Sequence, residues 1–272
     1  MGHRAFMSII PPLQAADTRP VLFDSHCHLD LPELLPELES HLANAKAVGV
    51  EGFLVPAVQS SAWLPLLELK QQYGFYIALG LHPWWASQSE FDALQGLEAL
   101  AALPQVSAIG EIGLDFALDE HSFALQRQCF EAQLQLAAKL KKPVILHHRK
   151  SQNELLQVIK QQQFSQGGIL HAFSGSFAQG KAFIDIGFKL GIGGTITYER
   201  AEKTRKAVKQ FPLDALVLET DSPSMPLHGF QGEINTPAQL PLVLKELAEL
   251  RGENQQQIAQ VLFNTTIQLI QT

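Results

Sequence analysis

Cysteine is scarce in this sequence of 272 residues. Cys27 and Cys129 are too few for a disulfide framework, which favours a reducing, cytoplasmic location. No run of 18 apolar residues is present, so we expect no membrane-spanning helix. Positive charge is not in excess either, since the formal net charge is -7. The chain is therefore not expected to coat nucleic acid through bulk positive charge, although a local cation could still bind phosphates.

The first twenty residues lack the long apolar core of a signal peptide, because Pro11 and Pro12 interrupt their only apolar stretch. We expect residues 1–20 to form a flexible N-terminal extension. No linker or low-complexity segment divides the rest, which is predicted to form a single catalytic domain over residues 21–272. A hydrophobic content of 46% is enough for a large core.

Eight short apolar runs rich in β-forming residues alternate with segments of helical periodicity. The runs begin near Val21, Gly52, Phe75, Val106, Pro143, Gly167, Lys189 and Leu216. Each step leaves room for one helix and two turns, as a parallel crossover requires. Helices are predicted over residues 124–142 and 237–251 and from about residue 254. The pattern favours a (β/α)8 TIM-type barrel over an open doubly wound sheet, because no glycine-rich dinucleotide fingerprint follows the first run.

Polar residues of metal-ligand type stand at the ends of six of these runs. They are His26, His28, His82, Glu111, His147, His171 and Asp221. The carboxyl ends of the strands carry the active site in barrels of this kind. The sequence therefore predicts that these side chains meet at one end of the barrel.

The pair His26 and His28 is the sharpest local signal. Residues i and i+2 of a strand face the same side, about 6.5–7 Å apart, so two imidazoles can converge on one cation. Strict alternation puts Asp24 on this inward face and Phe23 and Cys27 on the outward face. Cys27 is then expected to be a small buried apolar residue rather than a ligand.

Glu111 has glycine at positions 110 and 113, which lets neighbouring backbone approach closely. A buried carboxylate needs a partner, and its two oxygens can bridge two cations. A core glutamate in a salt bridge is the alternative. Asp115 is expected either to support the site or to be an ordinary loop residue.

Three further positions stay open at this level of reasoning. His147 and His148 are adjacent, so only one can point inward. His171 would be a plain core histidine if it did not end a strand. Glu219 and Asp221 share a face, so one is expected to bind metal and the other to orient ligands.

Six segments in this order and spacing resemble the TatD-type metal-dependent deoxyribonucleases of the amidohydrolase-like barrel superfamily, most of all their YjjV-like branch. The segments are FDSHCHLD, GLHP, GEIGLDF, PVILHHRKS, ILHAFSGS and LETDSP. The resemblance runs from Val21 to the C-terminus. Trp84 and His148 depart from the family pattern, because a histidine and a serine are usual at these positions.

The resemblance implies a centre of two divalent metal ions per chain. His26, His28 and Asp221 would hold one ion, His147 and His171 the other, and Glu111 would bridge them. The family's substrate-phosphate arginine falls on Arg149, and His82 matches the first histidine of its H-P-H motif. Nitrogen-rich sites suit Zn, Mn, Fe or Co, while the resemblance also implies Mg.

Four neutral histidines and two carboxylates would leave two divalent ions with excess positive charge, which favours an anionic substrate. We therefore expect a metal-dependent phosphodiesterase or deoxyribonuclease, in which a metal-activated water attacks. Asp221 would take up its proton, while His82 and Arg149 would stabilise charge on phosphoryl oxygens.

Two other function classes compete with this expectation. One is an amide, ester or lactone hydrolase; related barrels of that kind often carry a carboxylated lysine where Glu111 stands. The other is a binding protein with an inactive site. A phosphodiester, DNA among the candidates, is the expected partner, and neither a membrane nor an obligate protein partner is indicated.

Overall fold

The structure is a computed structural model that describes residues 19–271. Its single sheet has eight parallel strands in the chain order β1 to β8. They are β1 Leu22–Asp24, β2 Val50–Pro56, β3 Tyr76–Leu79, β4 Val106–Asp115, β5 Val144–Arg149, β6 Gly168–Leu170, β7 Phe188–Ile192 and β8 Leu216–Leu218. The backbone N–H of Ser25 donates to Leu218 O over 2.8 Å and so joins the first strand to the last. The predicted (β/α)8 barrel is confirmed, and the doubly wound alternative is wrong.

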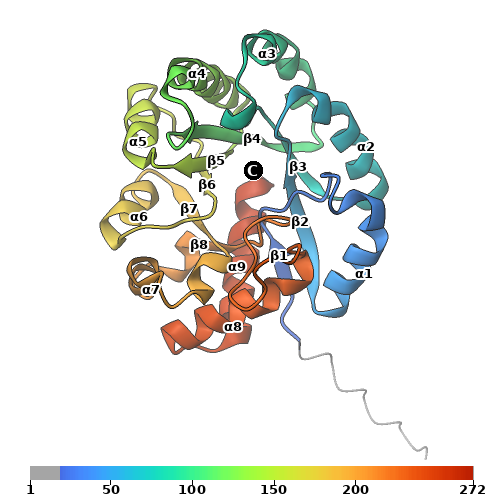
Figure 1. Ribbon diagram of the computed structural model, residues 1–272, viewed down its shortest axis with the longest axis vertical. Helices are drawn as coiled ribbons and strands as arrows, with labels where there is room; N and C mark the ends of the chain where they lie inside the picture. The colour runs from blue at the N-terminus through green and yellow to red at the C-terminus, as the bar shows by residue number, and fades with distance from the viewer. Residues whose placement is uncertain (1–18, 272) are drawn as a thin grey trace, which may run out of the picture.

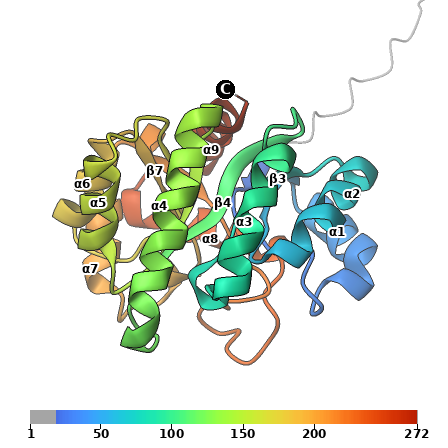
Figure 2. The same cartoon turned by 90° about the horizontal axis from the view of Figure 1, so that it is seen from above.

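Helices follow the strands and surround them as a ring (Figures 1 and 2). They are α1 Leu38–Ala47, α2 Trp63–Tyr73, α3 Gln88–Ala101, α4 Phe123–Leu140, α5 Gln152–Gln161, α6 Phe177–Ile184, α7 Glu202–Val208, α8 Leu240–Arg251 and α9 Gln255–Ile270. The three predicted helices correspond to α4, α8 and α9. Helix α4 ends before its predicted boundary, because Lys141 adopts a left-handed φ of 54°. No helix within residues 19–271 is long and apolar enough to cross a membrane.

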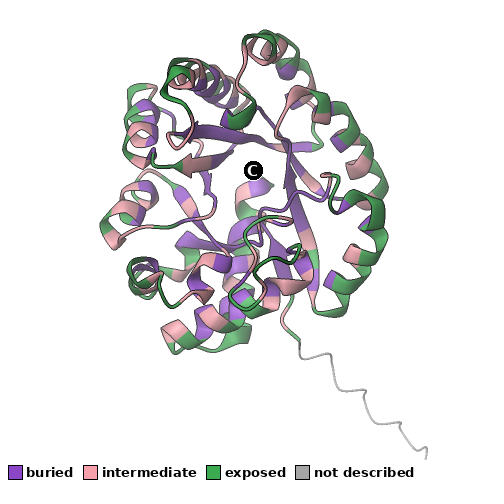
Figure 3. Cartoon of the chain, in the orientation of Figure 1, coloured by how far each residue is buried: buried purple, intermediate pink, exposed green. Residues whose placement is uncertain are grey.

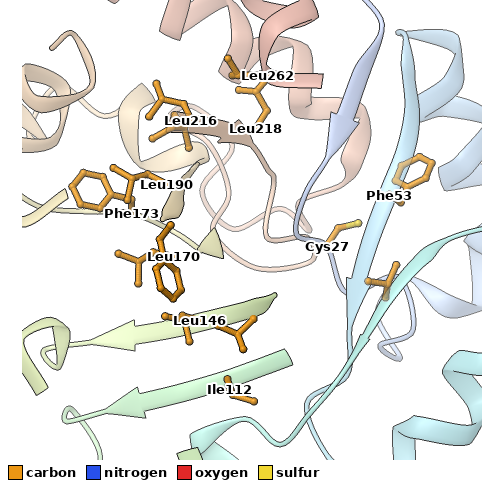
Figure 4. Close-up of a cluster of buried hydrophobic side chains, with 14 of the residues drawn as sticks. Cys27, Phe53, Ile112, Leu146, Leu170, Phe173, Leu190, Leu216, Leu218 and Leu262 are labelled. Carbon is orange, nitrogen blue, oxygen red and sulfur yellow. The ribbon is translucent and has the colours of Figure 1, made fainter. Parts of the chain in front are cut away.

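Two apolar layers hold the barrel together. The larger layer lies between the strands and the surrounding helices, and Figure 4 shows part of it, including Cys27 and Phe53. A smaller inner cluster takes one residue from each of seven strands: Phe23, Leu54, Ala78, Ala108, Ile145, Ile169 and Val217. Ile270 of α9 packs against it and closes this end of the barrel. Buried residues accordingly follow the strands, while the outer helix faces are exposed (Figure 3). This leaves the other end of the barrel for polar side chains.

The expected facing of the first strand is wrong at two residues. Phe23 belongs to the inner cluster, whereas Asp24 accepts hydrogen bonds from the backbone and hydroxyl of Thr220. The strand ends at Asp24, so strict alternation does not extend to His26 and His28. The expected flexible extension, residues 1–20, lies outside the described residues except for Arg19 and Pro20.

Candidate metal centre

Glu111 of β4 stands at the middle of the polar end of the barrel and is only 2% exposed. Its flanking glycines are needed for this position. A Cβ on Gly110 would lie 2.6 Å from Ile145 Cβ, and one on Gly113 would lie 2.1 Å from the carbonyl oxygen of His147. Neither site has room for a side chain, so β4 and β5 can approach closely around the carboxylate.

The two oxygens of Glu111 face different groups of histidines. Oε2 lies 3.2 Å from Nε2 of His26 and 3.4 Å from Nε2 of His28. Oε1 lies 3.1 Å from Nδ1 of His147 and 3.3 Å from Nε2 of His171. His82 is also on this side, with Nε2 3.4 Å from Oε1. The two oxygens of one carboxylate therefore face two sets of nitrogen donors, which meet where the rings of His26 and His171 stack with their centroids 3.8 Å apart.

Asp221 follows β8 and lies beside the first set. Its Oδ1 is 3.6 Å from Nε2 of His26 and 3.7 Å from Nε2 of His28. The residue has a left-handed φ of 59°, and its backbone N–H donates to His26 O over 2.9 Å. The buried amide of Asn235 donates to the carbonyl oxygens of Thr220 and Ser224 and so fixes the loop around Asp221. A left-handed conformation is uncommon for aspartate, and these hydrogen bonds hold Asp221 in it.

The spacing of these donors fits divalent cations. Two ligands about 2.1 Å from one ion, at tetrahedral or octahedral angles, lie about 3.0–3.4 Å apart. Nε2 of His26 and Nε2 of His28 are 3.1 Å apart. Burial favours the protonated acid, but His82, His171 and His26 outweigh it and hold the pKa of Glu111 well below its usual range. An ionised carboxylate among histidine nitrogens is a donor set that can bind metal.

Glu219 is the other residue considered beside Asp221 as a metal ligand. Its carboxyl group contacts His171 instead. Its carboxyl group is fully buried, and Oε1 accepts the backbone N–H of Ala172 over 2.5 Å. The same oxygen is 3.6 Å from Nδ1 of His171. This contact lies on the far side of the ring from Glu111, as expected of a residue that orients a ligand.

Asp115 is the fully buried last residue of β4, and its side chain reaches His147. Its Oδ2 lies 3.3 Å from Nε2 of His147 and accepts the indole N–H of Trp84 over 2.6 Å. Burial would raise the pKa of Asp115, but these two hydrogen bonds outweigh it and hold the pKa well below its usual range. Of the two readings of Asp115, the structure supports a role beside the site. No sequence signal pointed to Trp84 as its partner.

His147, not His148, turns its ring toward Glu111. His148 instead accepts a hydrogen bond from Nε2 of Gln152 over 3.3 Å, and burial lowers its pKa to about 3. The neutral ring of His148 therefore packs beside α5 and makes no contact with the Glu111 carboxylate.

Arg149 is the one predicted site residue that does not join the cluster. It is exposed and lines an open cleft of about 580 Å³ beside the end of β5, together with Lys150 and Gln152. Within residues 19–271 no carboxylate forms an ion pair with its guanidinium, in contrast to a rim arginine neutralised by a surface acid. The six predicted metal ligands and His82 do come together.

A parallel barrel with five histidines and four carboxylates gathered at its carboxyl end has the design of the metal-dependent hydrolase barrels. A sequence model of that class, described as TatD related DNase, matches residues 23–271. The chain belongs to this family and is a metal-dependent hydrolase of the TatD type.

Individual relatives agree with this assignment. The chain is 42% identical over 249 residues to the uncharacterized metal-dependent hydrolase YjjV of Escherichia coli K12, covering 90% of this chain and 96% of the relative. The crystal structure of YjjV, a TatD homolog, superimposes with a TM-score of 0.86 at 40% identity over 92% of this chain and 98% of that one. A phosphotriesterase-like lactonase mutant from Deinococcus radiodurans shares the fold alone, with a TM-score of 0.66 at 14% identity over 95% of this chain and 97% of that one.

Proposed function

We propose that this protein is a phosphodiesterase that cleaves DNA or a related phosphodiester with a water molecule activated by two divalent metal ions. The observation that carries the proposal is the position of Glu111, whose two oxygens face two different sets of ligand-type side chains. The description of the family as TatD related DNase supports the same substrate class.

In the proposed centre His26, His28 and Asp221 would hold one ion, and His147 and His171 would hold the other. Glu111 would be shared by the two ions. Bound there, the ions would lower the pKa of a water molecule and neutralise charge on the substrate. Zn, Mn, Fe and Co suit the nitrogen-rich donor set, and Mg remains a candidate through the family.

The remaining roles belong to side chains at the barrel mouth. Asp221 would accept the proton of the attacking water, a role supported by its carboxylate lying beside the His26 and His28 nitrogens. His82 would donate a hydrogen bond to a phosphoryl oxygen. Arg149 lies in the adjoining cleft without a carboxylate partner, so its guanidinium is available to bind a second phosphate oxygen.

The charge of the site favours a phosphodiester over an amide, ester or lactone. Glu111 and Asp221 supply two negative charges and the ionised Asp115 beside His147 a third, against the four positive charges of two divalent ions. The cleft adds Arg149 and Lys150, which a neutral ester would leave without a partner. Both cysteines are free and buried, in keeping with the proposed cytoplasmic location.

Reconstitution tests the proposal directly. The protein is purified free of metal, single metals are restored, and hydrolysis of a simple phosphodiester, a lactone and single-stranded DNA is compared. We expect one to two ions per chain and preferred cleavage of the phosphodiesters. His26→Ala should reduce the metal content, whereas His121→Ala, at an exposed histidine outside the site, should not. A wild-type protein that stays metal-free in every metal, or that prefers the lactone, contradicts the proposal.

A further inference from the structure

Trp84 combines an exposed ring with a buried anchor. The residue is 58% exposed, in the short 3-10 helix Pro83–Trp85 that follows β3. Its indole N–H nevertheless points inward and donates to Oδ2 of Asp115 over 2.6 Å. An exposed tryptophan that only covered the surface would need no such short, charge-assisted hydrogen bond.

Asp115 is held through both carboxylate oxygens and through its backbone. Its Oδ1 accepts the backbone N–H of Ala117 over 2.9 Å, and its Oδ2 accepts the indole N–H of Trp84. The amide of Gln126 bonds to both the backbone N–H and the carbonyl of Asp115, over 2.8 and 3.1 Å. Because indole is a donor only, Oδ2 must act as an acceptor, and the carboxylate cannot turn without losing a partner.

This arrangement requires a hydrogen on one particular nitrogen of His147. Nε2 of His147 lies 3.3 Å from the same Oδ2, so it must donate to it. The other nitrogen, Nδ1, is then the one that a metal ion can bind, in place of a hydrogen shared with the ionised Glu111. Nδ1 is the atom 3.1 Å from Oε1 of Glu111, on the side of the proposed metal centre.

We propose that Trp84 and Asp115 are a positioning pair that fixes the orientation of His147 and keeps a hydrogen on its Nε2, so that Nδ1 is presented as a metal ligand. The proposal deepens the proposed function and rests on it for the metal. The indole can only donate, so Oδ2 of Asp115 is always the acceptor in this pair.

Asp115→Asn is the sharpest test, because it preserves the size of the side chain and replaces one acceptor oxygen with a donor NH2 group. The Ala117 N–H still requires an oxygen, so the new NH2 group would face the donors of Trp84 and His147. Ring ¹⁵N chemical shifts of the metal-free protein should then show that Nε2 of His147 has lost its hydrogen, while Nδ1 keeps the one that it shares with Glu111. His147→Gln identifies its signals. Titration with Mn²⁺ should show affinity about 10–100-fold weaker than in the wild type.

Two substitutions of Trp84 separate its hydrogen bond from its aromatic face. Trp84→Phe keeps a ring but loses the donor, and should weaken Mn²⁺ binding about 10-fold and lower the occupancy of the hydrogen on Nε2 of His147. Trp84→Gln keeps an N–H of similar reach without a ring, and should restore most of both. Trp85→Phe is the matched control, because Trp85 is its exposed neighbour and makes no side-chain hydrogen bond within the described chain.

The outcomes distinguish the two proposals. If the wild type binds no Mn²⁺, the proposed function fails, while the hydrogen on Nε2 of His147 in the metal-free protein still tests the positioning pair. If the wild type binds Mn²⁺ and Asp115→Asn leaves both this hydrogen and the affinity unchanged, the positioning pair is wrong. A normal Trp84→Phe with an impaired Trp84→Gln would show that Trp84 acts through its ring instead.

Discussion

Gly191→Ala should disturb the support beneath His171 without touching a proposed ligand. Gly191 lies in β7 opposite Val217 of β8, and an added Cβ would stand 2.0 Å from Oε2 of Glu219. Ordinary contact begins at 3.4 Å, so the carboxyl group must retreat by about 1.4 Å, the difference between these two distances. Glu219 is fully buried, and its Oε1 accepts the Ala172 N–H. Both the surrounding side chains and this hydrogen bond therefore resist the movement of its carboxyl group.

The cost follows from this overlap. Overpacking of a rigid interior site typically destabilises a protein by about 1–3 kcal/mol. In a chain of this size each kcal/mol lowers Tm by roughly 2–4 °C, so we expect a decrease of about 2–12 °C. Since Glu219 contacts His171, metal content after reconstitution should fall as well.

Thermal unfolding followed by circular dichroism, together with elemental analysis, measures both effects. Gly96→Ala is the control, because Gly96 is an exposed residue of α3 with open space around its Cβ position. It should stabilise the protein by about 0.5–1 kcal/mol. A Gly191→Ala protein with wild-type Tm and wild-type metal content would refute the claim that this glycine makes room for Glu219.

Three further predictions concern single side chains. Glu111→Gln should weaken both metal sites together and reduce activity by orders of magnitude; elemental analysis that finds one ion retained at full affinity would make Glu111 a terminal ligand. Arg149→Ala should cost about 2–4 kcal/mol of transition-state stabilisation on a phosphodiester, far less on a neutral ester, and leave metal content intact; equal small losses in kcat/KM on both substrates would count against a phosphate contact. Burial raises the pKa of Cys129 to about 11 and that of Cys27 well above its usual range, so little thiolate is present at pH 8. Both thiols should therefore resist iodoacetamide at pH 8 until the protein is unfolded, and rapid labelling of the native protein would contradict their burial.

The periodicity of apolar residues along the sequence was sufficient to predict the barrel architecture. Strand and helix periodicities extend over a few residues, and their alternation leaves few topologies besides a barrel. The same reasoning placed ligand-type residues at the strand ends, because every parallel strand of a barrel opens to the same side. It anticipated the close approach at Gly110 and Gly113 from the absence of a side chain alone.

Alternation misassigned β1, because the strand is shorter than the pattern suggested. Phe23 packs into the inner cluster of the barrel, and Asp24 accepts a hydrogen bond from Thr220. The strand ends at Asp24, before His26. A periodicity argument assumes that the strand continues, and only the pairing of β1 with its neighbours shows where it ends.

The sequence by itself determined the barrel and the residue types at its carboxyl end, since both depend on short-range periodicity and strand order. Only the tertiary structure decided how the two oxygens of Glu111 are shared between histidines, and that Trp84 reaches Asp115 across 31 residues of chain. It also decided that Asn235 holds the loop of Asp221. Such contacts depend on the register of neighbouring strands and on loop conformation, and neither is encoded in the spacing of residues along one segment.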